Sequence, residues 1–126
     1  MPEQKHILIV DDEEPIRELL GEALAIAGYR VSVADSVSTA KRIVAATAPD
    51  LIITDLQLEQ SDGLALIEEI KSSHPDMPTV LLTGMLFDER AVEERINKRV
   101  SIYLAKTSPL KVILAEVNRL LGVAKN

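Results

Sequence analysis

The sequence contains no cysteine and no tryptophan, and it has no long stretch without a charged residue. The absence of cysteine excludes disulfides, thiolate metal ligands and thiol redox chemistry. The longest segment without a charge is 11 residues, at 77–87, whereas a membrane-spanning helix needs about 20 apolar residues. The first residues show no apolar segment followed by a cleavage site, so we expect no secretory signal. These absences favour a cytoplasmic protein with no membrane partner.

Basic and aromatic residues are also few. There are 14 lysines and arginines against 20 acidic residues, giving a net charge of −6, and the only aromatic residues are Tyr29, Phe87 and Tyr103. Nucleic-acid binding favours the opposite charge and more stacking surfaces, so we expect no direct nucleic-acid binding. Hydrophobic residues make up 47% of the chain, which excludes intrinsic disorder. A length of 126 residues predicts a single domain over 1–126.

Short apolar runs alternate with segments of helical periodicity along the whole chain. Five runs predict strands: 6–10, 29–34, 51–54, 79–83 and 100–105. Five helices are predicted between and after them: from Pro15 to Gly28, from Ser36 to before Pro49, at 63–73, at 88–99, and from Pro109 to Gly122, with a loop at 57–62. Strict alternation predicts an α/β fold with a parallel sheet covered on both faces. The polar–apolar alternation of 29–34 and 100–105 is typical of edge strands.

Polar side chains follow four of these strands directly. Asp11 and Asp12 come after the first, Asp55 after the third, Thr83 ends the fourth, and Lys106 follows the fifth. Ligands of open parallel sheets bind beyond the carboxyl ends of the strands. We therefore expect three carboxylates, a hydroxyl and an amine to meet at one end of the sheet.

Three neighbouring carboxylates need a positive charge among them, and a hard cation with oxygen ligands, such as Mg²⁺, would supply it. Together with an amine and a hydroxyl, this set suits phosphoryl transfer, with Asp55 as the better candidate nucleophile. Each residue alone also has a structural interpretation. The acids at 11–14 could serve the start of a helix, Asp55 could begin a turn, Thr83 could be structural, and Lys106 could be a surface charge. Because these residues occur together at successive strand ends, the sequence favours a functional site over the separate structural interpretations.

Four segments resemble the receiver domain of bacterial response regulators, including chemotaxis regulators. They are ILIVDDEEPIRELL, LIITDLQLEQSDGLALIEEIK, TVLLTG and IYLAK, in this order. The resemblance covers about residues 5–121 and leaves 122–126 as a tail or linker stub. It implies a flavodoxin-like, doubly wound sheet of five parallel strands in the order 2-1-3-4-5, with five helices.

The resemblance also implies a role for each polar residue of the expected site. Asp55 would be the phospho-acceptor, and Thr83 and Lys106 would contact the phosphoryl group. The implied Mg²⁺ ligands are the side chains of Asp11, Asp12 and Asp55 and the backbone carbonyl of Gln57.

A conformational switch and two partners follow from the same resemblance. Thr83 would move to the phosphoryl group and Tyr103 would turn into the space it leaves, which changes the face formed by the fourth helix, fifth strand and fifth helix. The phosphoryl donor would be a sensor histidine kinase or a phosphotransfer protein. An unknown downstream protein would read the changed face.

Three other functions compete with this interpretation. Thr107 and Glu59 stand where the family usually has proline, which leaves open a degenerate receiver that acts as a phosphorylation-independent interaction module. A turnover phosphatase with an aspartyl nucleophile would need an acid where Gln57 stands, so we expect a signalling domain that phosphorylates itself rather than an enzyme. A flavodoxin-like nucleotide-binding module would need a glycine-rich or hydroxyl-rich loop where the acids at 11–14 lie.

Overall fold

The computed structural model describes residues 4–55, 57–58, 61–83 and 102–122. Its strands and helices, in chain order, are β1 (His6–Val10), α1 (Glu14–Ile26), β2 (Arg30–Ala34), α2 (Val37–Ala46), β3 (Leu51–Asp55), β4 (Gln57–Leu58), β5 (Ser61–Asp62), α3 (Gly63–Ser73), β6 (Thr79–Thr83), β7 (Ile102–Ala105) and α5 (Leu110–Leu121). Four helices therefore lie in the described ranges, against five expected. The helix predicted at 88–99 lies outside the described residues.

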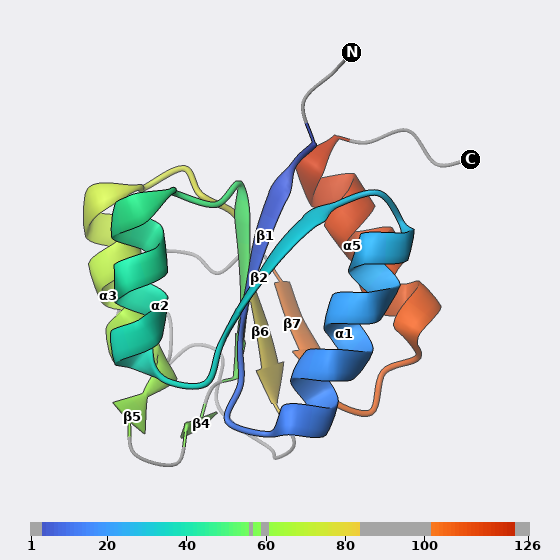
Figure 1. The fold of residues 1–126 in the computed structure, drawn as a ribbon, viewed down its shortest axis with the longest axis horizontal. Helices are drawn as coiled ribbons and strands as arrows, with labels where there is room; N and C mark the ends of the chain where they lie inside the picture. Colours follow the sequence, from blue (N-terminus) through green and yellow to red (C-terminus); the bar gives the residue numbers. More distant parts are fainter. Residues whose placement is uncertain (1–3, 56, 59–60, 84–101, 123–126) are drawn as a thin grey trace.

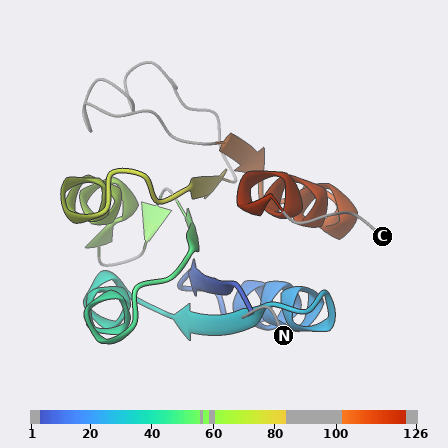
Figure 2. The ribbon, with the colours of Figure 1, turned by 90° about the horizontal axis from the view of Figure 1, so that it is seen from above.

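One sheet of five parallel strands forms the centre of the fold. Its order is β2-β1-β3-β6-β7, which is the expected order 2-1-3-4-5 when its members are counted along the chain. Helices α1 and α5 cover one face and α2 and α3 cover the other (Figures 1 and 2). The predicted doubly wound arrangement is therefore confirmed.

The burial of each strand follows its sequence pattern. All five positions of β1, β3 and β6 are buried, as expected for apolar runs in the middle of a sheet covered on both faces. The edge strands β2 and β7 are only partly buried. Two apolar clusters result, one between the sheet and helices α2 and α3, the other between the sheet and helices α1 and α5.

The helix ends also lie where the sequence predicts them. Pro15 is in the first turn of α1, where its missing N–H costs nothing. The side chain of Ser36 caps α2 by accepting a hydrogen bond from the backbone of Thr39. Gly28 and Gly122 have positive φ angles of 102° and 68° just after α1 and α5, a conformation that glycine adopts without steric cost.

The segment predicted as a loop at 57–62 contains a small hairpin instead. Strands β4 and β5 pair antiparallel, with Gln57 opposite Asp62 and Leu58 opposite Ser61. Two-residue strands are too short to show a hydrophobic period in the sequence, so this pairing could not be predicted. The hairpin lies at the carboxyl end of the main sheet (Figure 1). Across the described ranges, no helix is long and apolar enough to cross a membrane.

Candidate functional site

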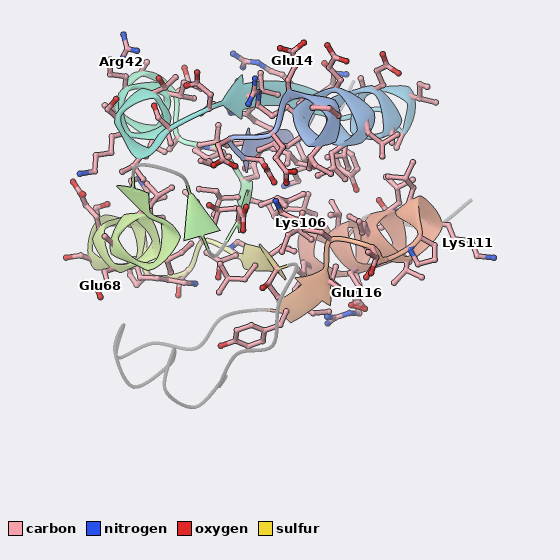
Figure 3. The ribbon with its side chains drawn as sticks, turned by 90° about the horizontal axis from the view of Figure 1, so that it is seen from below. Glu14, Arg42, Glu68, Lys106, Lys111 and Glu116 are labelled. Atoms are coloured by element: carbon pink, nitrogen blue, oxygen red, sulfur yellow. The ribbon has the colours of Figure 1, made fainter. Side chains whose placement is uncertain are left out.

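Four strands deliver polar side chains to one end of the sheet. Asp11 follows β1, Asp55 is the last residue of β3, Thr83 is the last of β6, and Lys106 follows β7. Parallel pairing aligns these strand ends, with Asp55 opposite Leu82 and Thr83 opposite Ala105. Figure 3 views the molecule from this end and shows Lys106 reaching toward its middle.

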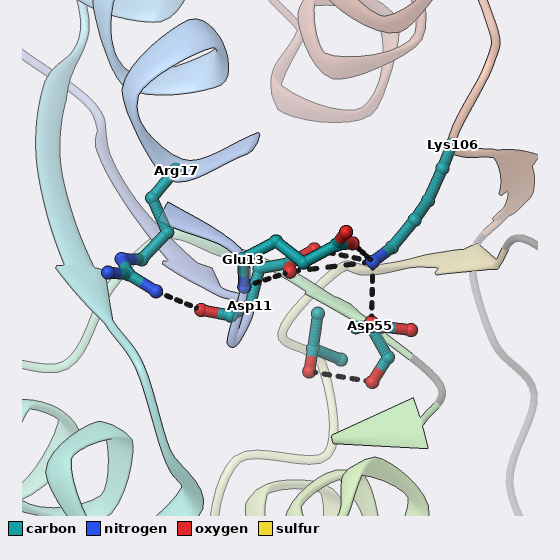
Figure 4. A network of polar contacts seen from close by, with 6 residues as sticks. Asp11, Glu13, Arg17, Asp55 and Lys106 are labelled. Atoms are coloured by element: carbon teal, nitrogen blue, oxygen red, sulfur yellow. Dashed lines mark hydrogen bonds and ion pairs between the residues drawn. The ribbon is translucent and has the colours of Figure 1, made fainter. Parts of the chain in front are cut away.

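The ammonium of Lys106 contacts three carboxylates at once. Its Nζ lies 2.7 Å from Oδ2 of Asp55, 3.2 Å from Oδ2 of Asp11 and 2.5 Å from Oε2 of Glu13 (Figure 4). The Asp11 and Asp55 side chains are 1% and 7% exposed, whereas that of Glu13 is 57% exposed. The expected meeting of acids and amine at this end of the sheet is therefore present.

Burial and ion pairing act in opposite directions on the pKa of Lys106 and on that of Asp11. Burial of Lys106 works against its positive charge, but hydrogen bonds to Asp55, Glu13 and Asp11 outweigh it and raise the pKa of Lys106 above its ordinary value. For Asp11, burial dominates and raises the pKa of the carboxyl group, opposed by the backbone N–H of Glu13 and by Lys106. The ionised form of Asp11 is thus incompletely compensated by the protein alone.

The donor set fits a divalent cation. One carboxylate oxygen from each of Asp11, Asp12, Glu13 and Asp55 lies within 4.8 Å of the others. The buried Oδ2 of Asp11 has no hydrogen-bond partner among the described residues, although it forms the ion pair with Lys106. These four carboxylates and the single Lys106 ammonium leave a local excess of negative charge, and hard oxygen donors suit Mg²⁺. These residues could therefore hold such an ion.

Backbone interactions fix the site residues from several sides. Arg17 on α1 donates from Nη1 to the carbonyl of Asp11 at 2.8 Å (Figure 4). The hydroxyl of Thr54 donates to the carbonyl of Asp55 at 3.2 Å. The backbone N–H of Lys106 donates to the carbonyl of Thr83 at 2.9 Å, which ties the loop after β7 to the end of β6. These hydrogen bonds link the site residues to α1 and to the ends of neighbouring strands.

The two residues predicted to form the switch lie on neighbouring strands. Thr83 is buried, and Tyr103 on β7 is partly buried, opposite Leu81 and packed against the cluster on the α2 and α3 face. Gln57 begins β4, two residues after Asp55. No cis peptide bond occurs in the described ranges, so Thr107 follows Lys106 through a trans bond. Glu59 lies outside them.

Glu13 is the site residue that sequence reasoning missed. The acids at 11–14 were interpretable as helix-terminal charges, and Glu13 does occupy the N-cap position of α1. Its side chain makes no capping hydrogen bond and contacts Lys106 instead. The run of four acids was the available signal, but the sequence does not show which of them turns toward a lysine from another strand.

Comparison with known proteins identifies the fold and the family. The chain matches the response regulator receiver domain over residues 7–118, and it belongs to this family. A solved response regulator receiver domain protein (CheY-like) from Methanospirillum hungatei superposes with a TM-score of 0.88 and 23% identity, over 95% of each chain. The signal receiver domain of an HD domain-containing protein from Pseudomonas fluorescens gives 0.85 and 28%, over 95% of this chain and 96% of that one.

The related sequences are receiver-containing regulators of greater length. Response regulator MprA of Mycolicibacterium vanbaalenii is 31% identical over 91% of this chain and 49% of its own. Transcriptional regulatory protein KdpE of Staphylococcus aureus is 30% identical over 98% of this chain and 52% of its own. The chain thus spans about half the length of these relatives. It is a receiver domain of the kind found in two-component response regulators.

Proposed function

We propose that this domain accepts a phosphoryl group on Asp55 in a Mg²⁺-dependent reaction and signals through the change that follows. The observation that carries the proposal is the 2.7 Å contact between the Lys106 ammonium and the Asp55 carboxylate, beside the buried Asp11. An ammonium at this distance is placed to contact a phosphoryl group bonded to the carboxylate. Family membership supports the same assignment.

The reaction is a direct displacement at phosphorus. An oxygen of the Asp55 carboxylate forms a bond to phosphorus while the bond between phosphorus and the donor breaks, and the donor leaves with the bonding electron pair. The product is an acyl phosphate. Asp55 reacts as the carboxylate, so no proton has to be removed from it. The Lys106 ammonium and the Thr83 hydroxyl then contact the phosphoryl oxygens.

The metal would be held by the side chains of Asp11, Asp12 and Asp55 and by the backbone carbonyl of Gln57. Bound there, Mg²⁺ would neutralise charge on the phosphoryl oxygens. The buried, incompletely compensated carboxylate of Asp11 supports this assignment, because a divalent cation supplies the missing positive charge. Arg17 positions the same residue by holding its carbonyl.

The proposed partners of this domain, which we place in the cytoplasm, are a sensor histidine kinase or phosphotransfer protein as donor and a downstream protein as reader. Phosphorylation adds about −1.5 to −2 charges at one point. Movement of Thr83 toward that charge would free space for Tyr103, which lies on the adjacent strand. The domain would act as a signalling module without turnover of a substrate and without contact to nucleic acid of its own.

Incubation with acetyl phosphate and Mg²⁺, followed by intact-mass measurement, tests the proposal. Wild-type protein should gain the mass of one phosphoryl group, and Asp55→Asn should gain none. Asp76→Asn removes an exposed carboxylate outside the site and should behave as wild type. Equal labelling of wild type and Asp55→Asn would refute the assignment of the acceptor.

The degenerate-receiver alternative is favoured by Thr107, which replaces the usual proline beside Lys106. Titration with Mg²⁺ and beryllofluoride, a phosphoryl mimic, separates the two functions. A switching receiver should show backbone chemical-shift changes that extend from Asp55 to β7. A degenerate receiver should show none beyond those that Mg²⁺ alone causes.

A further inference from the structure

Glu13 holds an unusual position at the mouth of the site. It is the N-cap residue of α1 with an extended backbone (φ −95°, ψ 112°), yet its side chain caps nothing. Instead, its carboxylate reaches the Lys106 ammonium at 2.5 Å, the shortest of the three ion pairs. Since the helix does not hold this side chain, the lysine is what fixes its conformation.

The three carboxylates around Lys106 differ strongly in their access to water. Asp11 and Asp55 are 1% and 7% exposed, while Glu13 is 57% exposed and lies on the solvent side of the ammonium. Releasing a buried carboxylate from its counter-ion is costly because water cannot replace the lost interaction. Glu13 can be re-solvated at small cost, because exposed ion pairs contribute little.

An incoming phosphoryl group needs the ammonium that these carboxylates already surround. A lysine has three N–H donors, and here its Nζ atom lies within ion-pair distance of three carboxylates. Before Asp55 has reacted, contact of the ammonium with the oxygens of an incoming phosphoryl group therefore requires Asp11 or Glu13 to release it. Exposure identifies Glu13 as the group that is displaced.

We infer that Glu13 is a positioning residue that holds Lys106 in the unphosphorylated domain and slows phosphorylation until a phosphoryl group displaces it. This inference rests on the proposed function of Asp55 and Lys106. It adds a regulatory contact at the same site: a surface carboxylate that competes with the phosphoryl group for one ammonium. The same negative charge repels anionic phosphoryl donors as they approach.

Glu14 offers a matched control because it is the next residue and carries the same charge. Its side chain is exposed on the outer side of α1, away from Lys106 (Figure 3), and no contact between the two is found within the described ranges. Glu13→Gln and Glu14→Gln therefore change the net charge equally, but only the first removes the ion pair. Glu13→Asp keeps the charge and shortens the reach by one methylene group.

The experiment measures the rate of phosphorylation by acetyl phosphate at Mg²⁺ concentrations shown to be saturating for each variant. Glu13→Gln should react about two- to fivefold faster than wild type, the factor expected from losing one partly exposed ion pair. Glu14→Gln should react at the wild-type rate, and Glu13→Asp should lie between. Equal rates for the two Gln variants, or a slower Glu13→Gln with a raised Mg²⁺ requirement, would overturn the inference.

A second measurement reports on Lys106 without phosphorylation. In protein labelled with ¹⁵N-lysine, the Nζ protons of Lys106 should exchange slowly with water because three carboxylates hold them, and the signal is assigned by its loss in Lys106→Met. Glu13→Gln should speed this exchange while Glu14→Gln leaves it unchanged, and unchanged exchange in both would refute the contact. If wild type is not phosphorylated on Asp55 at all, the proposed function fails, and this signal still decides whether Glu13 holds the lysine.

Discussion

The hydroxyl of Tyr29 donates a hydrogen bond to Oδ1 of Asn118 and so joins the residue before edge strand β2 to helix α5. Tyr29 is 5% exposed and belongs to the apolar cluster between the sheet and helices α1 and α5. The bond closes that cluster at the amino end of the sheet, at the opposite end from Asp55. It therefore contributes to stability without touching the proposed site.

Replacement of Tyr29 by Phe should lower the free energy of unfolding by about 1 kcal/mol, because the ring stays buried while Asn118 loses its donor. Urea unfolding of Tyr29→Phe, Asn118→Ala and the double variant measures the pair directly. The double variant should be more stable than the sum of the single effects predicts, since the second change finds no bond left to break. Additive effects would show that this hydrogen bond contributes nothing.

His6 should make the domain lose stability in mild acid. Burial, with the positive charge of Arg30, lowers the pKa of His6 below 6.5, and the negative charge of Asp50 only partly opposes this. The ring is 4% exposed and its Nε2 pairs with Oγ of Ser32 at 2.7 Å. The unfolded chain therefore binds a proton at His6 more readily than the folded protein does. The contribution of His6 to the free energy of unfolding is fully present above pH 6.5 and is lost as pH falls through the folded-state pKa.

Between pH 7 and 5, the free energy of unfolding should therefore fall with a slope of up to about 1.4 kcal/mol per pH unit from this one group. His6→Gln should flatten the fall, measured by urea unfolding at a series of pH values. His74→Gln, which changes the chain's other histidine in the loop after α3, should keep it. The same fall in His6→Gln as in wild type would assign the acid sensitivity to other groups.

The sequence patterns predicted the sheet well because burial on both faces leaves a clear signal. β1, β3 and β6 are continuous apolar runs and proved fully buried, and the residues after them had to meet because parallel strands end together. The contact of Glu13 with Lys106 left no such signal. It depends on how the loop after β7 meets the start of α1, which is a matter of tertiary packing. The pairing of β4 with β5 could not be predicted for a different reason, because strands of two residues show no hydrophobic periodicity.

Two glycines allow a comparison of backbone strain without side-chain clashes. A Cβ added at Gly28 or at Gly122 would meet nothing within 4 Å, so the φ angle alone decides the cost. Gly122, at 68°, lies in the left-handed region that other residues reach at about 1–2 kcal/mol, whereas Gly28, at 102°, lies beyond it. Gly28→Ala should therefore lower the free energy of unfolding more than Gly122→Ala. Equal losses in urea unfolding would contradict this ranking.

Asp11 should reduce stability when no metal is bound. Burial raises the pKa of Asp11 above 3.8 in the folded protein. Its contribution to the free energy of unfolding is therefore fully present below pH 3.8 and is lost as pH rises through the folded-state pKa. At pH 7 with a chelator, Asp11→Asn should therefore raise the free energy of unfolding by about 1 kcal/mol. The amide keeps the oxygen that accepts from the backbone of Glu13 at 2.9 Å. Asp76→Asn, an exposed change, should have no effect.

Addition of Mg²⁺ should reverse the order of the two proteins. A ligand that binds only the folded state raises the free energy of unfolding by RT ln(1 + [L]/Kd), and wild type should gain in this way as the metal concentration rises. Asp11→Asn should gain little, because it has lost the buried carboxylate oxygen that no hydrogen bond satisfies in the described residues. Thermal unfolding over a Mg²⁺ series measures both curves. An Asn variant that is less stable than wild type under chelator, or that gains as much from Mg²⁺, would show that Asp11 is not kept for the metal.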